Sequence, residues 1–134
     1  MLALSYAPSP AARPAAPPPD LGEALQRAHR EARASGAFLE PPFAFHRLSP
    51  EAAAAVAPRA GGGRAWVLVT VRPSDDAGHR AHTRERCLTA AQRFMLQLAC
   101  DDVDSVWVAP EPGAVRAAGL DIGDGEPVGL IRCG

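Results

Sequence analysis

The stretch TRERCLTAAQRFMLQLACDDVDSVWVA, residues 83–109, decides the fold of this chain. Up to residue 100 its apolar side chains recur at helical spacing, which predicts one long helix with a single buried face. The positions predicted on that face are Leu88, Ala91, Met95, Leu98 and Ala99, with Phe94 beside them. A turn with three aspartates follows, and the β-branched and aromatic residues at 105–109 predict a strand. The stretch therefore predicts a helix that leads through a short turn into a sheet.

Two more helices and an extended segment are predicted before this stretch. Asp20 and Glu23 have the spacing of a capping box, and apolar residues recur at helical spacing as far as Gly36, which predicts a helix over 21–35. Residues 37–47 hold three phenylalanines and two prolines, a composition typical of a packed loop or a short extended run. A second helix is expected to begin at Pro50, because proline is favoured at the first helical position, and to end before Pro58.

Further strands are predicted at residues 66–71 and 128–133. The first of them, WVLVTV, is continuously apolar and rich in β-branched residues, so it should be covered on both faces. Three glycines at 61–63 predict a flexible turn before it, and a short helix is expected over 111–119. Strands separated by helices with short connections indicate an α+β or α/β sandwich.

The first nineteen residues differ in composition from the rest. Six of the fourteen prolines lie there, so we expect residues 1–19 to form a disordered or polyproline-like arm and residues 20–134 to form a single domain. A signal peptide is not indicated, since residues 1–7 lack a charged region and a long apolar run. The three cysteines are odd in number and widely spaced, which argues against a disulfide framework and favours the cytoplasm.

The charge balance excludes several classes of function. The net charge is −1 and the pI is near 6.4, which argues against a generally basic nucleic-acid binder and against a polyacidic tail. No stretch is long and apolar enough for a membrane span. All 14 basic residues are arginines, so a Schiff-base lysine and a phosphate-binding lysine are both excluded within this sequence.

Three clusters have a functional and a plain structural interpretation. His79, His82 and Cys87 have a spacing that is unusual for zinc, so no metal is expected and the histidines should be surface residues. The aspartates of residues 101–104 lack the glycine and glutamate of a calcium loop and predict a solvated turn. A basic cluster suits an anionic cofactor such as NADPH or a nucleic-acid phosphate, but a solvated helix face is the preferred interpretation. Its members are Arg80, Arg84, Arg86 and Arg93.

The cysteine that ends the long helix has two interpretations as well. Cys100 could act as a nucleophile only with a histidine base close in space, which a sequence does not reveal. We therefore expect it to be a small buried hydrophobic residue.

The order of segments in residues 60–134 resembles the nitroreductase family of flavoproteins. The resemblance rests on an apolar helix (AQRFML, residues 91–96), a tryptophan-bearing strand, a short helix (VRAAGLDI, residues 115–122) and a closing strand (EPVGLIRCG, residues 126–134). The earlier strand that opens with Trp66 resembles the family's Gln-Pro-Trp strand. The resemblance implies an α+β sandwich with a small, mostly antiparallel sheet flanked by helices.

The resemblance also implies a function and a set of site residues. Members of the family bind FMN at the interface of a homodimer and pass a hydride from NAD(P)H through the flavin to a small-molecule electron acceptor. Arg30 and Arg33 match the family's arginine-rich, phosphate-binding motif at the end of the first helix, and Arg132 is a further candidate. No catalytic side chain is predicted, because the flavin carries the chemistry.

The chain also departs from the family pattern. Gly62 and Arg64 stand where members carry asparagine and glutamine, the turn after the long helix is acidic instead of glycine-rich, and the segment between Val71 and Thr83 is short. Family members continue beyond the position that matches Gly134. We therefore expect a truncated or divergent member. The alternative is a non-enzymatic paralogue that keeps the fold and acts through dimerisation or partner binding.

Overall fold

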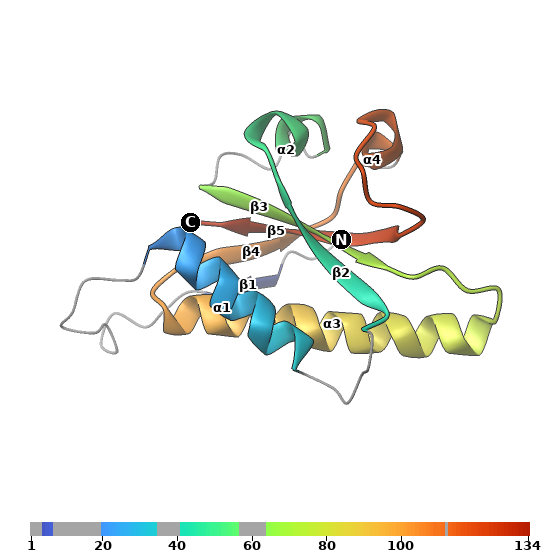
Figure 1. Ribbon diagram of the computed structural model, residues 1–134, viewed down its shortest axis with the longest axis horizontal. Helices are drawn as coiled ribbons and strands as arrows, with labels where there is room; N and C mark the ends of the chain where they lie inside the picture. The colour runs from blue at the N-terminus through green and yellow to red at the C-terminus, as the bar shows by residue number, and fades with distance from the viewer. Residues whose placement is uncertain (1–3, 7–19, 35–40, 57–63, 112) are drawn as a thin grey trace.

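A five-stranded antiparallel sheet forms the centre of the molecule (Figure 1). The computed structural model describes residues 4–6, 20–34, 41–56, 64–111 and 113–134. The strands follow the order β1-β4-β5-β3-β2, so β1 and β2 form the two edges. Their bounds are Leu4–Tyr6 for β1, Phe43–Leu48 for β2, Ala65–Val71 for β3, Ser105–Val108 for β4 and Glu126–Cys133 for β5.

In the described residues, four helices cover the two faces of the sheet. The long helices α1 (Leu21–Arg33) and α3 (Ala77–Cys100) lie on one face, and the short helices α2 (Pro50–Val56) and α4 (Ala114–Ala117) lie on the other (Figure 1). This arrangement confirms the predicted α+β sandwich and the antiparallel sheet. In the part of the chain that the structure describes, no helix is both long enough and apolar enough to cross a membrane.

Strand β3 is the central buried strand, as its apolar sequence predicts. All seven of its residues are buried. Val67 and Val69 face the core formed with α1 and α3, whereas Leu68 faces the core formed with α2 and α4. A strand covered on both faces needs no polar face, which explains the uninterrupted apolar run.

The core between the sheet and the long helices is made of small and large side chains packed together. Helix α1 presents Ala24, Ala28 and Ala32, all fully buried, and these small residues let α1 approach α3 closely. Helix α3 contributes the large buried side chains Phe94 and Met95.

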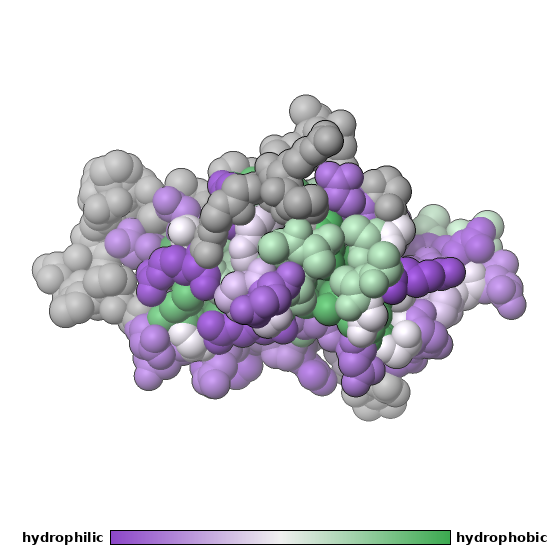
Figure 2. Space-filling model, turned by 90° about the horizontal axis from the view of Figure 1, so that it is seen from above, coloured by the Kyte–Doolittle hydropathy of each residue, from purple (hydrophilic) through white to green (hydrophobic). Residues whose placement is uncertain are grey.

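The opposite core is smaller and only partly covered. Trp66, Leu68 and Leu130 lie beneath α2 and α4, and several apolar side chains around them remain partly exposed. Figure 2 shows apolar side chains gathered on this side of the molecule. The partly buried residues of this cluster are Leu48, Val108, Ala118, Leu120 and Ile122.

Helix α3 begins six residues earlier than the sequence suggests and turns a slightly different face inward. Asp76 caps it, since its carboxylate accepts a hydrogen bond of 2.9 Å from the backbone N–H of His79. The prediction of Leu88 and Ala99 on the inner face is wrong: Leu88 is 39% exposed and Ala99 is half-buried. The buried stripe instead passes through Cys87, which lies one position before Leu88.

Other expectations need smaller corrections. Leu4–Tyr6 form strand β1 against β4, so the prediction that residues 1–19 lack regular structure is wrong for these three residues. Asp20 precedes α1 without a side-chain cap hydrogen bond, so the predicted capping box is not formed. The extended run predicted within 37–47 becomes β2, and α4 begins only at Ala114. The glycine turn at 61–63 lies outside the described residues.

A close contact between neighbouring strands depends on one glycine. The indole of Trp107 in β4 lies across Gly129 in β5, where a β-carbon would overlap the ring. Trp107 packs against the core on the side of α1 and α3. Glycine is therefore required at residue 129 for this tryptophan to lie flat on the sheet.

Candidate functional site

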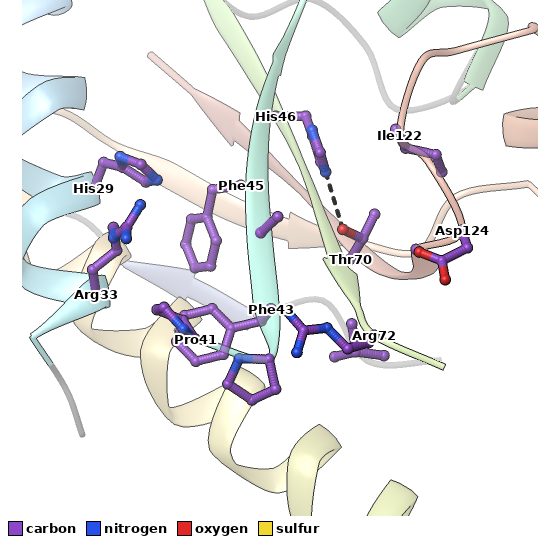
Figure 3. Close-up of a pocket in the computed structure, with 14 residues that line it drawn as sticks. His29, Arg33, Pro41, Phe43, Phe45, His46, Thr70, Arg72, Ile122 and Asp124 are labelled. Carbon is purple, nitrogen blue, oxygen red and sulfur yellow. Dashed lines mark hydrogen bonds between the residues drawn. The ribbon is translucent and has the colours of Figure 1, made fainter. Parts of the chain in front are cut away.

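A cavity opens where the end of α1 meets the edge strand β2. Its volume is about 460 Å³, which is within the range of small-molecule and cofactor sites (Figure 3). Helix α1 contributes His29 and Arg33, and the turn before β5 contributes Ile122, Asp124 and Gly125. The strands and the residues beside them contribute Pro41, Pro42, Phe43, Ala44, Phe45, His46, Thr70, Val71 and Arg72.

Strand alternation divides the side chains of the cavity between the two faces of β2. Phe43 and Phe45 point toward α1, and His46 points to the other side, toward Thr70 (Figure 3). Because β2 is an edge strand, no further strand of the described chain covers its outer side. The cavity therefore reaches around the sheet edge and combines an aromatic wall with a polar wall.

The aromatic wall consists of rings in mutual contact. The ring of Phe45 lies 6.0 Å from that of His29, 5.9 Å from that of Phe43 and 5.0 Å from that of Phe94, measured between centroids. All three pairs are tilted, which is a favourable arrangement for aromatic contacts. A flat heteroaromatic ligand would find an apolar surface here.

A hydrogen bond between His46 and Thr70 builds the polar wall. His46 Nε2 and Thr70 Oγ1 lie 3.0 Å apart, and Thr70 is only 2% exposed (Figure 3). Gly125 allows the turn to approach Thr70, because a β-carbon at residue 125 would lie 3.0 Å from the threonine side chain. The threonine is thereby held in one position, and the histidine ring with it.

The two histidines contribute little positive charge at neutral pH. Burial lowers the pKa of His46, although the negative charge of Asp121 opposes this effect. Burial also lowers the pKa of His29, and the positive charge of Arg33 lowers it further. Among the described lining residues, the fixed charges are therefore two guanidinium groups, from Arg33 and Arg72, and the carboxylate of Asp124.

A smaller cavity of about 240 Å³ extends the aromatic wall along α1. It shares His29 and Phe45 with the main cavity and continues past Leu25 to Gly22 and Arg47. The two cavities together form a groove between α1 and β2. This shape suits an elongated ligand with a flat ring and an anionic group.

The structure separates the three arginines that the sequence singles out. Arg33 lines the main cavity, whereas Arg30 does not, although both lie in the last turn of α1. Arg132 pairs with Trp66 at one end of β3, and the cavity lies near Thr70 toward the other end. The three residues do not converge on one site, and their phosphate-binding role stays a prediction.

Several residues of the cavity were not predicted from the sequence. His29 is one of them, although it lies four residues before the predicted Arg33, a spacing that places both on the same face of α1. Arg72 directly follows the strand β3. The contact between His46 and Thr70 could not be predicted from local sequence, because strand pairing brings together residues that are 24 positions apart.

The acidic turn is more buried than predicted. Asp101 is only 7% exposed, so the expectation of a solvated aspartate is wrong at this residue. Arg27 Nη1 donates to Asp101 Oδ1 at 2.8 Å, and Gln97 Nε2 donates to Oδ2 at 3.3 Å. The carboxylate thus ties α1 to the end of α3 and does not face the candidate cavity.

The histidines and cysteines of α3 do not converge. His79 and His82 are exposed, and Arg86 Nε donates to His82 Nε2 at 3.0 Å. Cys87 is fully buried, and burial raises the pKa of its thiol to about 12. Cys100 is exposed, contrary to the expectation of a buried hydrophobic residue. Burial also raises the pKa of Cys133 to about 12.

Comparison with known proteins identifies this arrangement of elements. Neither family models nor characterised relatives match the sequence. A solved structure from Parabacteroides distasonis, provisionally named an NADH dehydrogenase/NAD(P)H nitroreductase, matches with a TM-score of 0.63 and 20% identity over 88% of this chain and 76% of its own. A protein of the same provisional name from Bacteroides thetaiotaomicron matches with a TM-score of 0.61 and 18% identity, over 84% and 72% of the two chains. The chain therefore has the nitroreductase-like α+β fold.

Proposed function

We propose that the chain is an FMN-dependent oxidoreductase that transfers hydride from NAD(P)H to a small electron acceptor. The cavity at the end of α1 carries the proposal, because it combines Arg33 with an aromatic wall in a nitroreductase-like fold. A guanidinium fork suits a phosphate dianion, and the rings of Phe43 and Phe45 suit a flat isoalloxazine. The donor types and the size of the cavity fit FMN.

The residues of the cavity would bind and orient the cofactor. The flavin supplies the hydride chemistry when it is bound. Arg33 would hold the phosphate, Phe45 would exclude water from one face of the ring, and His46, positioned by Thr70, would offer a hydrogen-bonding group at the other wall. The two histidines are largely uncharged at neutral pH, so the arginines would supply the attraction for the phosphate.

The same proposal includes a homodimer in the cytoplasm. Two leucines on the outer side of α3, Leu88 and Leu96, are 39% and 49% exposed and lie about two helical turns apart. They would gain from burial against a second copy. The three cysteines are free, which suits a reducing compartment.

An absorption spectrum of the purified chain tests the cofactor assignment. After incubation with FMN and removal of the unbound flavin, we expect the chain to retain an oxidised-flavin band between about 350 and 500 nm, a property of the cofactor itself. A titration of the apoprotein should show that Arg33→Gln weakens FMN binding at least about tenfold, because a charge-assisted contact to phosphate is lost. Arg30→Gln removes the same charge from the same helical turn outside the cavity and should change the affinity less than about twofold. A protein that stays colourless with excess FMN would overturn the proposal.

One observation favours a second candidate, a partner-binding protein without a cofactor. The face between α2 and α4 leaves apolar side chains such as Leu120 and Ile122 partly exposed, and a partner chain could cover them. Size-exclusion measurements with and without FMN separate the candidates. A complex whose stability does not depend on FMN supports partner binding, whereas a marked rise in stability with FMN supports the oxidoreductase.

A further inference from the structure

A second cationic cavity lies beside the candidate flavin site. Its volume is about 290 Å³, and it is formed by the end of β3, the first turns of α3 and the start of β5. Three arginines line it, together with the carboxylate of Glu126. The lining residues are Val71, Arg72, Ala77, Arg80, Ala81, Arg84 and Glu126.

The two cavities are neighbours. Both are lined by Val71 and Arg72, at the point where the chain leaves β3. A ligand that occupies the main cavity therefore has a strongly cationic recess next to it. Such a recess would bind an anionic group of a second ligand that approaches the first.

Helix geometry selects two members of the basic cluster for this cavity. Arg80 and Arg84 are four residues apart and share one face of α3, whereas Arg86 and Arg93 do not line the cavity. Arg80 Nη1 donates to the backbone carbonyl of Ser74 at 3.3 Å, which orients its guanidinium. The cluster in the sequence is therefore two separate groups in the structure.

The balance of charge around the cavity favours a dianion. Among the described residues that line it, three are arginines and one, Glu126, carries a carboxylate. Asp76, just before α3, caps the helix by accepting a hydrogen bond from the N–H of His79. Arginine binds phosphate oxygens in a bidentate manner, so a phosphomonoester with two negative charges matches the site.

We infer that Arg80 and Arg84, with Arg72, form a subsite for the 2′-phosphate of NADPH. The inference rests on the proposed function, because the dinucleotide must present its nicotinamide to a flavin in the adjacent cavity. NADH lacks the 2′-phosphate and would leave the three guanidinium groups without their dianion. The subsite thus makes the chain selective for NADPH over NADH. An extended nucleic acid is a poorer match, since the recess is small and Arg93 lies outside it.

Binding of the oxidised dinucleotides to the full chain tests the subsite without any flavin. Titration calorimetry at low ionic strength should show that NADP+ binds at least about tenfold more tightly than NAD+, which differs only in lacking the 2′-phosphate. The double variant Arg80→Gln/Arg84→Gln should reduce this preference to less than about twofold. Arg93→Gln removes one charge from the exposed side of the same helix and should keep the preference. Circular dichroism verifies that each variant is folded.

Equal binding of NADP+ and NAD+ would overturn the subsite, and so would a loss of preference in Arg93→Gln as large as in the double variant. Binding of a single-stranded RNA homopolymer that depends on Arg80 and Arg84, without any preference for NADP+, would also overturn it. The outcome is independent of the flavin assignment. If FMN fails to bind while the preference persists, the subsite stands and the proposed function fails. If FMN binds but the preference is absent, the subsite fails and the proposed function stands.

Discussion

Replacing Gly129 by alanine should destabilise the sheet through a single contact. The added β-carbon would overlap the indole of Trp107, which lies across Gly129 from the neighbouring strand. The ring must then tilt away, or the two strands must move apart. Either change disturbs the core beneath Trp107, because that side chain packs against the cluster formed with α1 and α3.

The size of the effect follows from two opposing contributions. Overpacking of a well-filled site costs about 1–3 kcal/mol. Alanine is favoured over glycine inside a strand by about 0.5–1 kcal/mol, which offsets part of that cost. We expect Gly129→Ala to lower the free energy of unfolding by about 1–2 kcal/mol, or roughly 4 °C in Tm for each kcal/mol in a domain of this size.

A double-mutant cycle with Trp107→Val isolates the contact. Without the indole the alanine has room, so Gly129→Ala should be neutral or stabilising by up to about 1 kcal/mol in that background. Urea unfolding of the four proteins gives a coupling free energy of about 1–3 kcal/mol if the steric account holds. Equal effects of Gly129→Ala in both backgrounds would refute the reasoning, as would an unchanged stability of the single variant.

Three further predictions concern buried polar groups. Asp101→Asn should lower the free energy of unfolding by about 1 kcal/mol, and Arg27→Gln should then have no additional effect in urea unfolding, because their ion pair is already lost. Burial raises the pKa of Cys87 and Cys133 to about 12, so stability is kept below their ordinary pKa of about 9 and is lost as the pH rises above it. Each thiol should lower the free energy of unfolding by about 1.4 kcal/mol at pH 10 relative to neutral pH. Cys87→Ala should therefore make the urea midpoint less dependent on pH above pH 9. Because the pKa of His46 is lowered in the folded chain, its contribution to stability is kept above about pH 6.5 and falls as the solution is acidified. His46→Gln should therefore make the urea midpoint less dependent on pH between pH 7 and pH 5.

Local patterns in the chain predict most of its elements. The apolar run of β3, the small-residue face of α1 and the proline that starts α2 each have a short-range physical cause. They therefore appear in the structure near their predicted positions. The sequence predicts the start of α3 at Thr83, whereas the helix begins at Ala77. The residues around Asp76 have the composition of a turn, and this hides the role of Asp76 as the helix cap. The predicted inner face of α3 is confirmed at Ala91, Phe94, Met95 and Leu98. It is wrong at Ala99 and at Leu88, whose neighbour Cys87 is buried instead.

The candidate site was only partly visible in the sequence. Arg33 was selected through the family resemblance, and it lines the main cavity. Arg30 was selected by the same motif, yet it does not line the cavity although it lies in the same helical turn. Helical spacing alone does not tell which of two arginines faces a strand that is distant in sequence.

The sequence by itself determined most of the element types and the apolar strand at the centre, because these depend on periodicity and on local propensity. Local patterns left α+β and α/β open, and the family resemblance implied the α+β class. Only the tertiary structure decided which side chains meet. The antiparallel pairing of β2 with β3 brings His46 to Thr70, and the packing of α1 beside β2 brings His29 to Phe45. The tertiary structure also brings Arg80 and Arg84, but not Arg86 or Arg93, to a cavity beside the main one. Such contacts depend on the register and packing of distant segments, which no local pattern encodes.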